Sequence, residues 1–191
     1  MSIHDFFRAG DLDLRGLAAY LDSLSPATRV AETRDLSAEE QARLFDAAAG
    51  FRPVTLDDFV ASDAPPLAPV VHYGRNSLPM FRLFEKRFCR PDTAPDELWG
   101  YNEQTWKSFT GPGYFVAKRA SDREVVIDYC EVPPRKPAAW PPILPNSARL
   151  SRFIYYRTRD FMRGLSKHVT IGRATRDGKP MDNWFVLCRE S

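Results

Sequence analysis

The sequence lacks a long apolar run. Hydrophobic residues make up 43% of the chain, yet no stretch approaches the roughly 18 apolar residues that a membrane-spanning helix needs. Residues 1–10 also lack the basic start and apolar core of a secretory signal. We therefore expect no membrane-spanning segment and no secretion, and a cytoplasmic location is the default expectation.

Cysteine and histidine are scarce. Cys89, Cys130 and Cys188 are far apart and odd in number, which argues against a disulfide framework and favours free thiols. The three histidines and the absence of a CxxC pair leave few ligands for zinc. A site built from His72, His168 and a carboxylate stays open as an alternative, but the sequence predicts no metal and no other cofactor.

Glycine-rich phosphate loops are also missing. Residues 111–113 read Gly-Pro-Gly, which is shorter than the glycine spacings of nucleotide-binding loops and is not followed by a helix start. Two glycines around a proline are typical of a tight turn, so this segment is expected to lead into a strand.

Charge and aromatic residues are distributed unevenly. Residues 1–70 carry 12 acidic side chains against 6 Arg and no Lys, whereas residues 71–191 carry 21 basic side chains against 13 acidic ones and 18 of the 24 aromatic residues. The net charge of +2 hides this division. Either the two parts pack together or the basic part meets an anion. Because residues 64–69 hold three prolines, we expect an acidic helical region over 1–68 and a basic, aromatic-rich β region over 69–191, sharing one core.

The first region is expected to be helical. Apolar residues recur at helical spacing after residue 13, and Pro26 is expected to close that helix. Ser37 followed by Glu40 is the pattern of a capping box, in which each side chain bonds a free backbone amide, and predicts a second helix. Thr55 with Asp58 indicates a further turn. The apolar positions of the first helix are Leu14, Leu17, Ala18 and Leu21.

The second region is expected to be an antiparallel sheet. Five short segments rich in β-branched and aromatic residues are predicted strands: 114–118, 124–130, 152–157, 168–174 and 183–189. Residues 120–122 and 177–178 are expected hairpin turns. The six prolines in 133–145 predict an extended crossover around the sheet. Residues 80–90 fit either a helix or a strand, and we favour the helix.

An antiparallel sheet of this size must cover one face, either with the N-terminal helices or by closing on itself. The predicted fold class is therefore α+β, with short N-terminal helices packed on a curved antiparallel sheet or small β-barrel. Such a shape often encloses a ligand.

Aromatic residues mixed with polar ones are typical of small-molecule pockets, because rings supply contact area and polar groups fix orientation. The same composition also occurs at ordinary sheet edges. The candidate ligand-binding residues are His72, Arg75, Asn76, Trp99, Tyr101, Asn102, Tyr114 and Tyr129.

Acid–base chemistry has three candidate residues, His168, Asp128 and Asp160. Asp128 alternates with Ile127 and Tyr129 along a predicted strand, so it faces the opposite side, either solvent or a partly apolar cavity. Asp160 and Arg163 would pair on one helical turn. His168 follows them and is either a general base or a structural histidine.

We therefore expect a small-molecule-binding protein with an aromatic-lined pocket in a curved sheet. One alternative is a small cofactor-independent enzyme that uses His/Asp acid–base chemistry. Another is an interaction module whose acidic region masks a basic face. Interleaved basic and aromatic residues also occur in nucleic-acid-binding proteins, but a near-neutral total makes nucleic acid an unexpected partner. The oligomeric state stays open.

Overall fold

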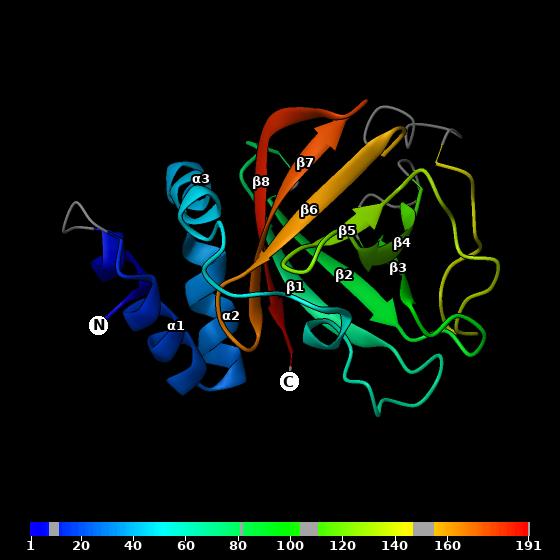
Figure 1. The fold of residues 1–191 in the computed structure, drawn as a ribbon, viewed down its shortest axis with the longest axis horizontal. Coiled ribbons are helices and arrows are strands. Elements are labelled where there is room, and N and C mark those ends of the chain that lie inside the picture. The colour runs from blue at the N-terminus through cyan, green and yellow to red at the C-terminus, as the bar shows by residue number, and fades with distance from the viewer. Residues whose placement is uncertain (8–11, 81, 104–110, 147–154, 191) are drawn as a thin grey trace.

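The computed structural model describes residues 1–7, 12–80, 82–103, 111–146 and 155–190, and in it three α-helices precede a closed antiparallel barrel (Figure 1). This confirms the predicted α+β class in its closed form. The helical elements are η1 (Ile3–Phe7), α1 (Leu14–Ser23), α2 (Pro26–Asp35), α3 (Ala38–Ala47) and η2 (Leu56–Asp58). The strands are β1 (Val70–Asn76), β2 (Leu83–Cys89), β3 (Glu97–Glu103), β4 (Tyr114–Arg119), β5 (Val125–Asp128), β6 (Thr158–Gly164), β7 (Val169–Arg176) and β8 (Lys179–Arg189).

The strands follow chain order around the barrel, and β1 closes it by pairing with β8. Both predicted hairpin turns are confirmed, because β4 pairs with β5 and β7 with β8. At the second turn, Asp177 and Gly178 both have positive φ, 53° and 76°, as a two-residue hairpin that follows the strand twist requires.

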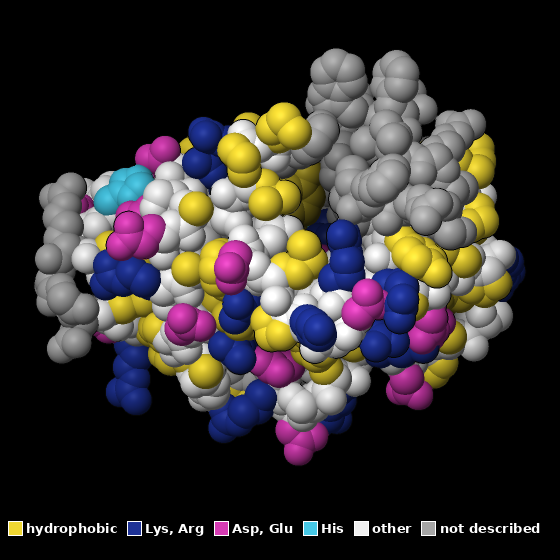
Figure 2. All heavy atoms as spheres, turned by 90° about the horizontal axis from the view of Figure 1, so that it is seen from above, with side chains coloured by type: hydrophobic (Ala, Val, Ile, Leu, Met, Phe, Trp, Pro, Cys, Tyr) yellow, Lys and Arg dark blue, Asp and Glu magenta, His cyan; other side chains and the backbone are white. Residues whose placement is uncertain are grey.

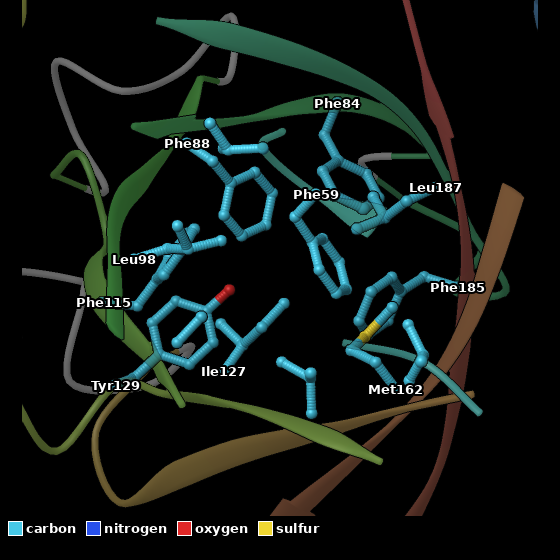
Figure 3. Close-up of a cluster of buried hydrophobic side chains, with 14 of the residues drawn as sticks. Phe59, Phe84, Phe88, Leu98, Phe115, Ile127, Tyr129, Met162, Phe185 and Leu187 are labelled. Atoms are coloured by element: carbon cyan, nitrogen blue, oxygen red, sulfur yellow. The ribbon is translucent and has the colours of Figure 1, made fainter. Parts of the chain in front are cut away.

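The barrel interior is filled mainly by aromatic side chains. Phe84 and Phe88 point inward from β2, Phe115 from β4 and Phe185 from β8 (Figure 3), as expected for the inner positions of strands whose side chains alternate. One end is filled by Phe59, which follows η2 and is fully buried. The N-terminal part of the chain therefore contributes to the core of the barrel.

The helices cover one outer side of the barrel. α2 contacts β1 and β8, and α3 contacts β7 and β8. Leu17, Leu21 and Leu44 from the helices share one buried cluster with Ile171 and Val186 from the strands. Burial of such apolar side chains is the main stabilising contribution at this interface.

A second outer side is covered by the proline-rich segment. Trp140 packs on Tyr101 and Tyr114, with ring centroids 4.9 and 6.4 Å apart, and the Tyr114 hydroxyl donates to the carbonyl of Pro141 at 2.5 Å. The segment wraps the sheet as predicted. However, it joins β5 to β6, which are neighbours, so the expectation of a crossover is wrong.

Among the described residues, arginines of the basic region bond to backbone carbonyls of the first region more often than to its carboxylates. Arg75 donates to Arg34 at 2.8 Å, Arg123 to Gly50 at 2.7 Å and Arg163 to Phe45 at 2.7 Å. Arg90 adds an ion pair with Asp57. On the face seen in Figure 2, basic and acidic side chains of the described residues are interspersed. The uneven charge along the sequence therefore does not mean that the two regions are held together mainly by attraction between opposite charges.

One expectation for a local element is wrong. Residues 83–89 form β2 and not a helix, and Phe81 lies outside the described residues. α1 ends at Ser23, shortly before Pro26 as expected. Pro26 also occupies the first turn of α2 behind the N-cap Ser25, where a missing amide costs nothing, and α2 was not predicted. The capping box of α3 is confirmed, with Ser37 and Glu40 in the predicted roles.

The strand expected over 152–157 is displaced along the chain. Residues 155–157 form a turn, β6 begins at Thr158, and residues 152–154 lie outside the described residues. Asp160 and Arg163 consequently lie on a strand, where a separation of three turns their side chains to opposite faces. β1 and β3 were not predicted.

Within the described residues, no helix is long and apolar enough to cross a membrane. Cys89, Cys130 and Cys188 are free thiols, as predicted.

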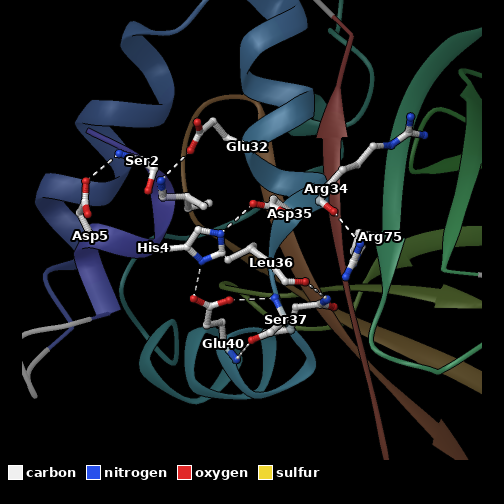
Figure 4. Close-up of polar contacts among 12 residues, drawn as sticks. Ser2, His4, Asp5, Glu32, Arg34, Asp35, Leu36, Ser37, Glu40 and Arg75 are labelled. Atoms are coloured by element: carbon white, nitrogen blue, oxygen red, sulfur yellow. Dashed lines mark hydrogen bonds and ion pairs between the residues drawn. The ribbon is translucent and has the colours of Figure 1, made fainter.

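The N-terminal segment is held on the helices by a histidine between two carboxylates. His4 Nδ1 lies 2.7 Å from Glu40 Oε1, and His4 Nε2 lies 2.9 Å from Asp35 Oδ2 (Figure 4). The hydrogen bonds to Glu40 and Asp35 raise the pKa of His4 above 6.5. Burial opposes ionisation of Glu40, but hydrogen bonds from His4 and Ser37 outweigh it and lower the pKa of Glu40 below 4.5.

Replacing His4 by Gln should remove a pH-dependent part of the stability. Because the folded-state pKa of His4 is raised, its contribution is complete below pH 6.5 and is lost as the pH rises through the folded-state value. Glu40 contributes above pH 4.5 and loses its contribution as the pH falls through its lowered pKa. Since His4 is 34% exposed, we expect a loss of about 0.5–1 kcal/mol near pH 6.

Urea unfolding of both proteins near about pH 6 and about pH 9 measures this difference. Glu39→Gln is the matched control, because Glu39 is an exposed carboxylate next to Glu40 on α3. This substitution should not change the pH dependence of the stability. An equal effect of His4→Gln at both pH values would contradict the ion-pair explanation.

Candidate functional site

A lysine lies inside the barrel. Lys86 occupies the inward position between Phe84 and Phe88 on β2 and is only 2% exposed. Its Nζ donates to Asn102 Oδ1 at 3.0 Å, to Asp160 Oδ2 at 3.2 Å and to the Tyr129 hydroxyl. The Asn102 amide also donates to the Tyr129 hydroxyl, at 2.9 Å. Four side chains from different parts of the barrel thus form one buried polar network.

Aromatic rings surround the same amine. Lys86 Nζ lies 4.9 Å from the ring centroids of Tyr129 and Phe185, 5.3 Å from that of Phe115 and 5.6 Å from that of Phe84. Ring faces attract a cation, most strongly where water is excluded. The rings offset part of the cost of removing this ammonium from water.

Burial shifts the pKa values of the network. It lowers the pKa of Lys86, against the opposing effect of Asp160, and raises the pKa of Asp160, against the opposing effect of Lys86. Burial and the charge of Asp160 also raise the pKa of the Tyr129 hydroxyl well above 10. The pKa values of Lys86 and Asp160 are therefore closer to each other than those of the two groups in water, and Tyr129 stays protonated.

The network lies in the wall of a cavity of about 230 Å³. Leu78, between β1 and β2, and Met181, on β8, place the cavity at the end of the barrel opposite Phe59. The cavity combines apolar walls with several polar groups. The lining residues are Asn76, Leu78, Phe84, Lys86, Asn102, Tyr129, Tyr155, Thr158, Asp160, Ala174, Arg176, Met181, Asn183 and Phe185.

Four of the residues singled out in the sequence lie in this lining: Asn76, Asn102, Tyr129 and Asp160. The others lie elsewhere. Trp99, Tyr101 and Tyr114 face outward into the cluster around Trp140, and Arg75 points to α2.

The remaining acid–base candidates are also outside the cavity. As predicted, Asp128 faces away from Ile127 and Tyr129; it lies 2.7 Å from Arg159 Nε on the outer side. His72 lies near Phe59, donating from Nε2 to its carbonyl at 2.9 Å, and burial lowers its pKa to about 4. His168 accepts from Arg189 at 3.3 Å, and burial lowers its pKa. The two histidines thus do not join Asp160.

Lys86 was missed as a site residue, although the sequence contains a signal for it. Phe84, Lys86 and Phe88 alternate with period two, which places the lysine on the same face as two phenylalanines if the segment is a strand. In a helix Phe84 and Phe88 share a face that Lys86 does not join, so the helical interpretation gave no reason to select Lys86. Tyr155 and Arg176 gave no comparable local signal.

Among the described residues, no group of three or more His, Cys, Asp or Glu side chains is arranged to hold a metal ion. Comparison of the chain with protein-family models and with curated proteins finds no match. The interpretation of the site therefore depends on its geometry.

Removing one partner of the buried ion pair should be costly. Asp160→Asn leaves the Lys86 ammonium without a counter-charge, and we expect a loss of about 3–5 kcal/mol in the free energy of unfolding. Lys86→Met should cost a similar amount. The double variant should cost less than the two single effects added, by about 1–3 kcal/mol.

Denaturant unfolding of the three variants measures this coupling. Asp122→Asn is the control, because Asp122 and its partner Arg119 are 93% and 66% exposed and such a pair contributes about 1 kcal/mol or less. Strictly additive effects of the two single substitutions would contradict the paired arrangement of Lys86 and Asp160.

Proposed function

We propose that this protein binds a small organic molecule in the mouth of the barrel, with an apolar body and an oxygen-bearing group such as a carbonyl or carboxylate. The observation that carries the proposal is the buried network of Lys86, Asn102, Tyr129 and Asp160 in a cavity wall that is otherwise rich in apolar side chains. Ligand sites commonly combine apolar walls with a few convergent polar groups.

The size of the cavity limits the ligand. An engineered cavity of about 150 Å³ accepts benzene, so a cavity of about 230 Å³ suits a body of one ring or a short chain with a small polar substituent. Larger ligands would have to extend past Leu78 and Met181 into solvent.

The charges of the lining favour an acceptor group on the ligand. Lys86 and Arg176 are basic and Asp160 is acidic, which leaves an excess of positive charge if all three are ionised. Lys86, the Asn102 amide and the Tyr129 hydroxyl carry N–H and O–H donors. The three N–H groups of the Lys86 ammonium already bond to Asn102, Asp160 and Tyr129, so a ligand oxygen would replace one of these partners. A carbonyl or carboxylate oxygen would complement these donors.

The alternatives receive less support. Acid–base catalysis by histidine would need His72 or His168 beside the cavity, whereas neither belongs to its lining. Masking of a basic face would need ion pairs across the interface, whereas several arginines bond to carbonyl groups there.

Two conservative variants test the site. Tyr129→Phe keeps the ring and removes a hydroxyl of the network, and Tyr114→Phe makes the same change on the outer side. With benzoate as the probe, Tyr129→Phe should weaken binding about 5–10-fold, the value of one hydrogen bond. Tyr114→Phe should leave the affinity within about twofold.

Chemical shifts of the labelled protein during benzoate titration give both the affinity and the location of binding. Native mass spectrometry of the purified protein should first establish whether a small molecule is already bound. Shift changes confined to the outer cluster around Trp140, or equal effects of the two variants, would place the ligand elsewhere and overturn the proposal.

A further inference from the structure

We infer that Lys86 is a nucleophilic amine that forms a protonated imine with a small aldehyde entering the barrel mouth. This inference rests on the proposed small-molecule site and specifies its ligand class. A carboxylate ligand would only be held by hydrogen bonds, whereas an aldehyde would be bound covalently and reversibly.

The position of the amine is the first argument. Lys86 Nζ lies in the cavity wall, at the centre of the network and not at its edge. β2 pairs with β1 and β3 on both sides, which fixes the backbone of Lys86. An amine held in this way meets a molecule in the cavity in one orientation, which favours attack on a carbonyl carbon.

The protonation state of the amine is the second argument. An ammonium has no lone pair and cannot attack, so a reactive lysine must lose a proton near neutral pH. Burial lowers the pKa of Lys86, and it raises that of Asp160 3.2 Å away. Transfer of one proton from Lys86 to Asp160 produces a neutral amine beside a neutral carboxylic acid.

The reaction balances with these groups alone. The Lys86 nitrogen attacks the aldehyde carbon, and the C=O electron pair moves to oxygen, which takes the proton from Asp160. The nitrogen then returns a proton to the Asp160 carboxylate, completing a neutral carbinolamine. Protonation of its hydroxyl by Asp160 expels water as the nitrogen lone pair forms the C=N bond. The net change is ammonium plus aldehyde to iminium plus water.

The groups around Lys86 favour each stage of imine formation. Tyr129 and Asn102 offer an O–H and N–H donors that could bind the carbonyl oxygen before attack. The iminium product carries the same positive charge as the ammonium, so Asp160 and the surrounding rings still stabilise it. The barrel interior also limits the access of water that would hydrolyse the product.

Lys118 is a surface lysine of the same chain with which the reactivity of Lys86 can be compared. Lys118 is 39% exposed, lies 2.6 Å from Glu131 and has a raised pKa because of that hydrogen bond. Because a lower pKa leaves a larger neutral fraction of the amine, Lys86 should react faster than Lys118 near neutral pH. Lys118 reports the background reactivity of a surface lysine in the same molecule.

Reductive trapping tests the inference. The intact protein is incubated with benzaldehyde and cyanoborohydride near pH 7, and peptide mapping locates the benzyl groups. The expected result is one rapidly formed benzyl adduct on Lys86, with slower labelling of Lys118. Labelling of Lys86 no faster than Lys118 would overturn the inference.

Lys86→Arg keeps the cation and removes the nucleophile. It should abolish the rapid adduct and leave the slow surface labelling unchanged. If this variant does not fold, the map of the unmodified protein still decides the question. Tyr129→Phe should slow the adduct on Lys86, whereas Tyr114→Phe should not; equal rates would exclude the positioning role of Tyr129 but not the nucleophile.

Benzoate binding separates the two proposals. If benzoate binds in the cavity but benzaldehyde is not trapped on Lys86, the non-covalent site stands and the imine is excluded. If neither probe occupies the cavity, the proposed small-molecule function fails together with the inference drawn from it.

Discussion

The structure depends on the closure of the hydrogen-bonded ladder between β1 and β8. A closed ladder leaves no strand edge and separates an inner face from an outer face at every strand. The inner face holds the phenylalanines and the Lys86 network, while the outer face is covered in two places by unrelated segments, the helices and the proline-rich connection. Both coverings, and the cavity itself, follow from which face each side chain takes.

The interior position also explains why four ordinary polar residues have unusual properties. Exposed on a surface, a lysine, an aspartate, a tyrosine and an asparagine would titrate normally and contribute little. Inside the barrel each must find its partner among the others, since an unpaired buried polar group is costly. The network is therefore both a constraint on folding and the part of the cavity with chemical character. Burying this network reduces stability, and functional sites commonly contain residues that conflict with the stability of the fold in this way.

Local signals were sufficient for part of this fold. The capping box of Ser37 and Glu40, the apolar spacing of α1 and the turn at Asp177 and Gly178 depend on residues close in sequence, so they could be predicted. β2 could not, because Phe81, Phe84 and Phe88 also match the spacing of a helix face. Only pairing with β1 and β3, which are distant in sequence, selects the strand.

For the same reason, only part of the candidate site could be predicted from the sequence. Asn102 and Tyr129 were named as polar residues in aromatic surroundings and Asp160 as an acid–base candidate, whereas Lys86 becomes a site residue only once β2 is known to be a strand.

The pairing of His72 with Arg189 has a consequence for folding on the ribosome. Contacts between residues so far apart in sequence form slowly, because a long loop must close before they are gained. Until β8 has been synthesised, one edge of β1 has no native partner, and an uncovered strand edge can pair with another chain. The α2 helix, which is made earlier, packs on the outer face of β1 and leaves this edge open. Translation speed between β1 and β8 would then influence how much of the protein aggregates before the barrel closes.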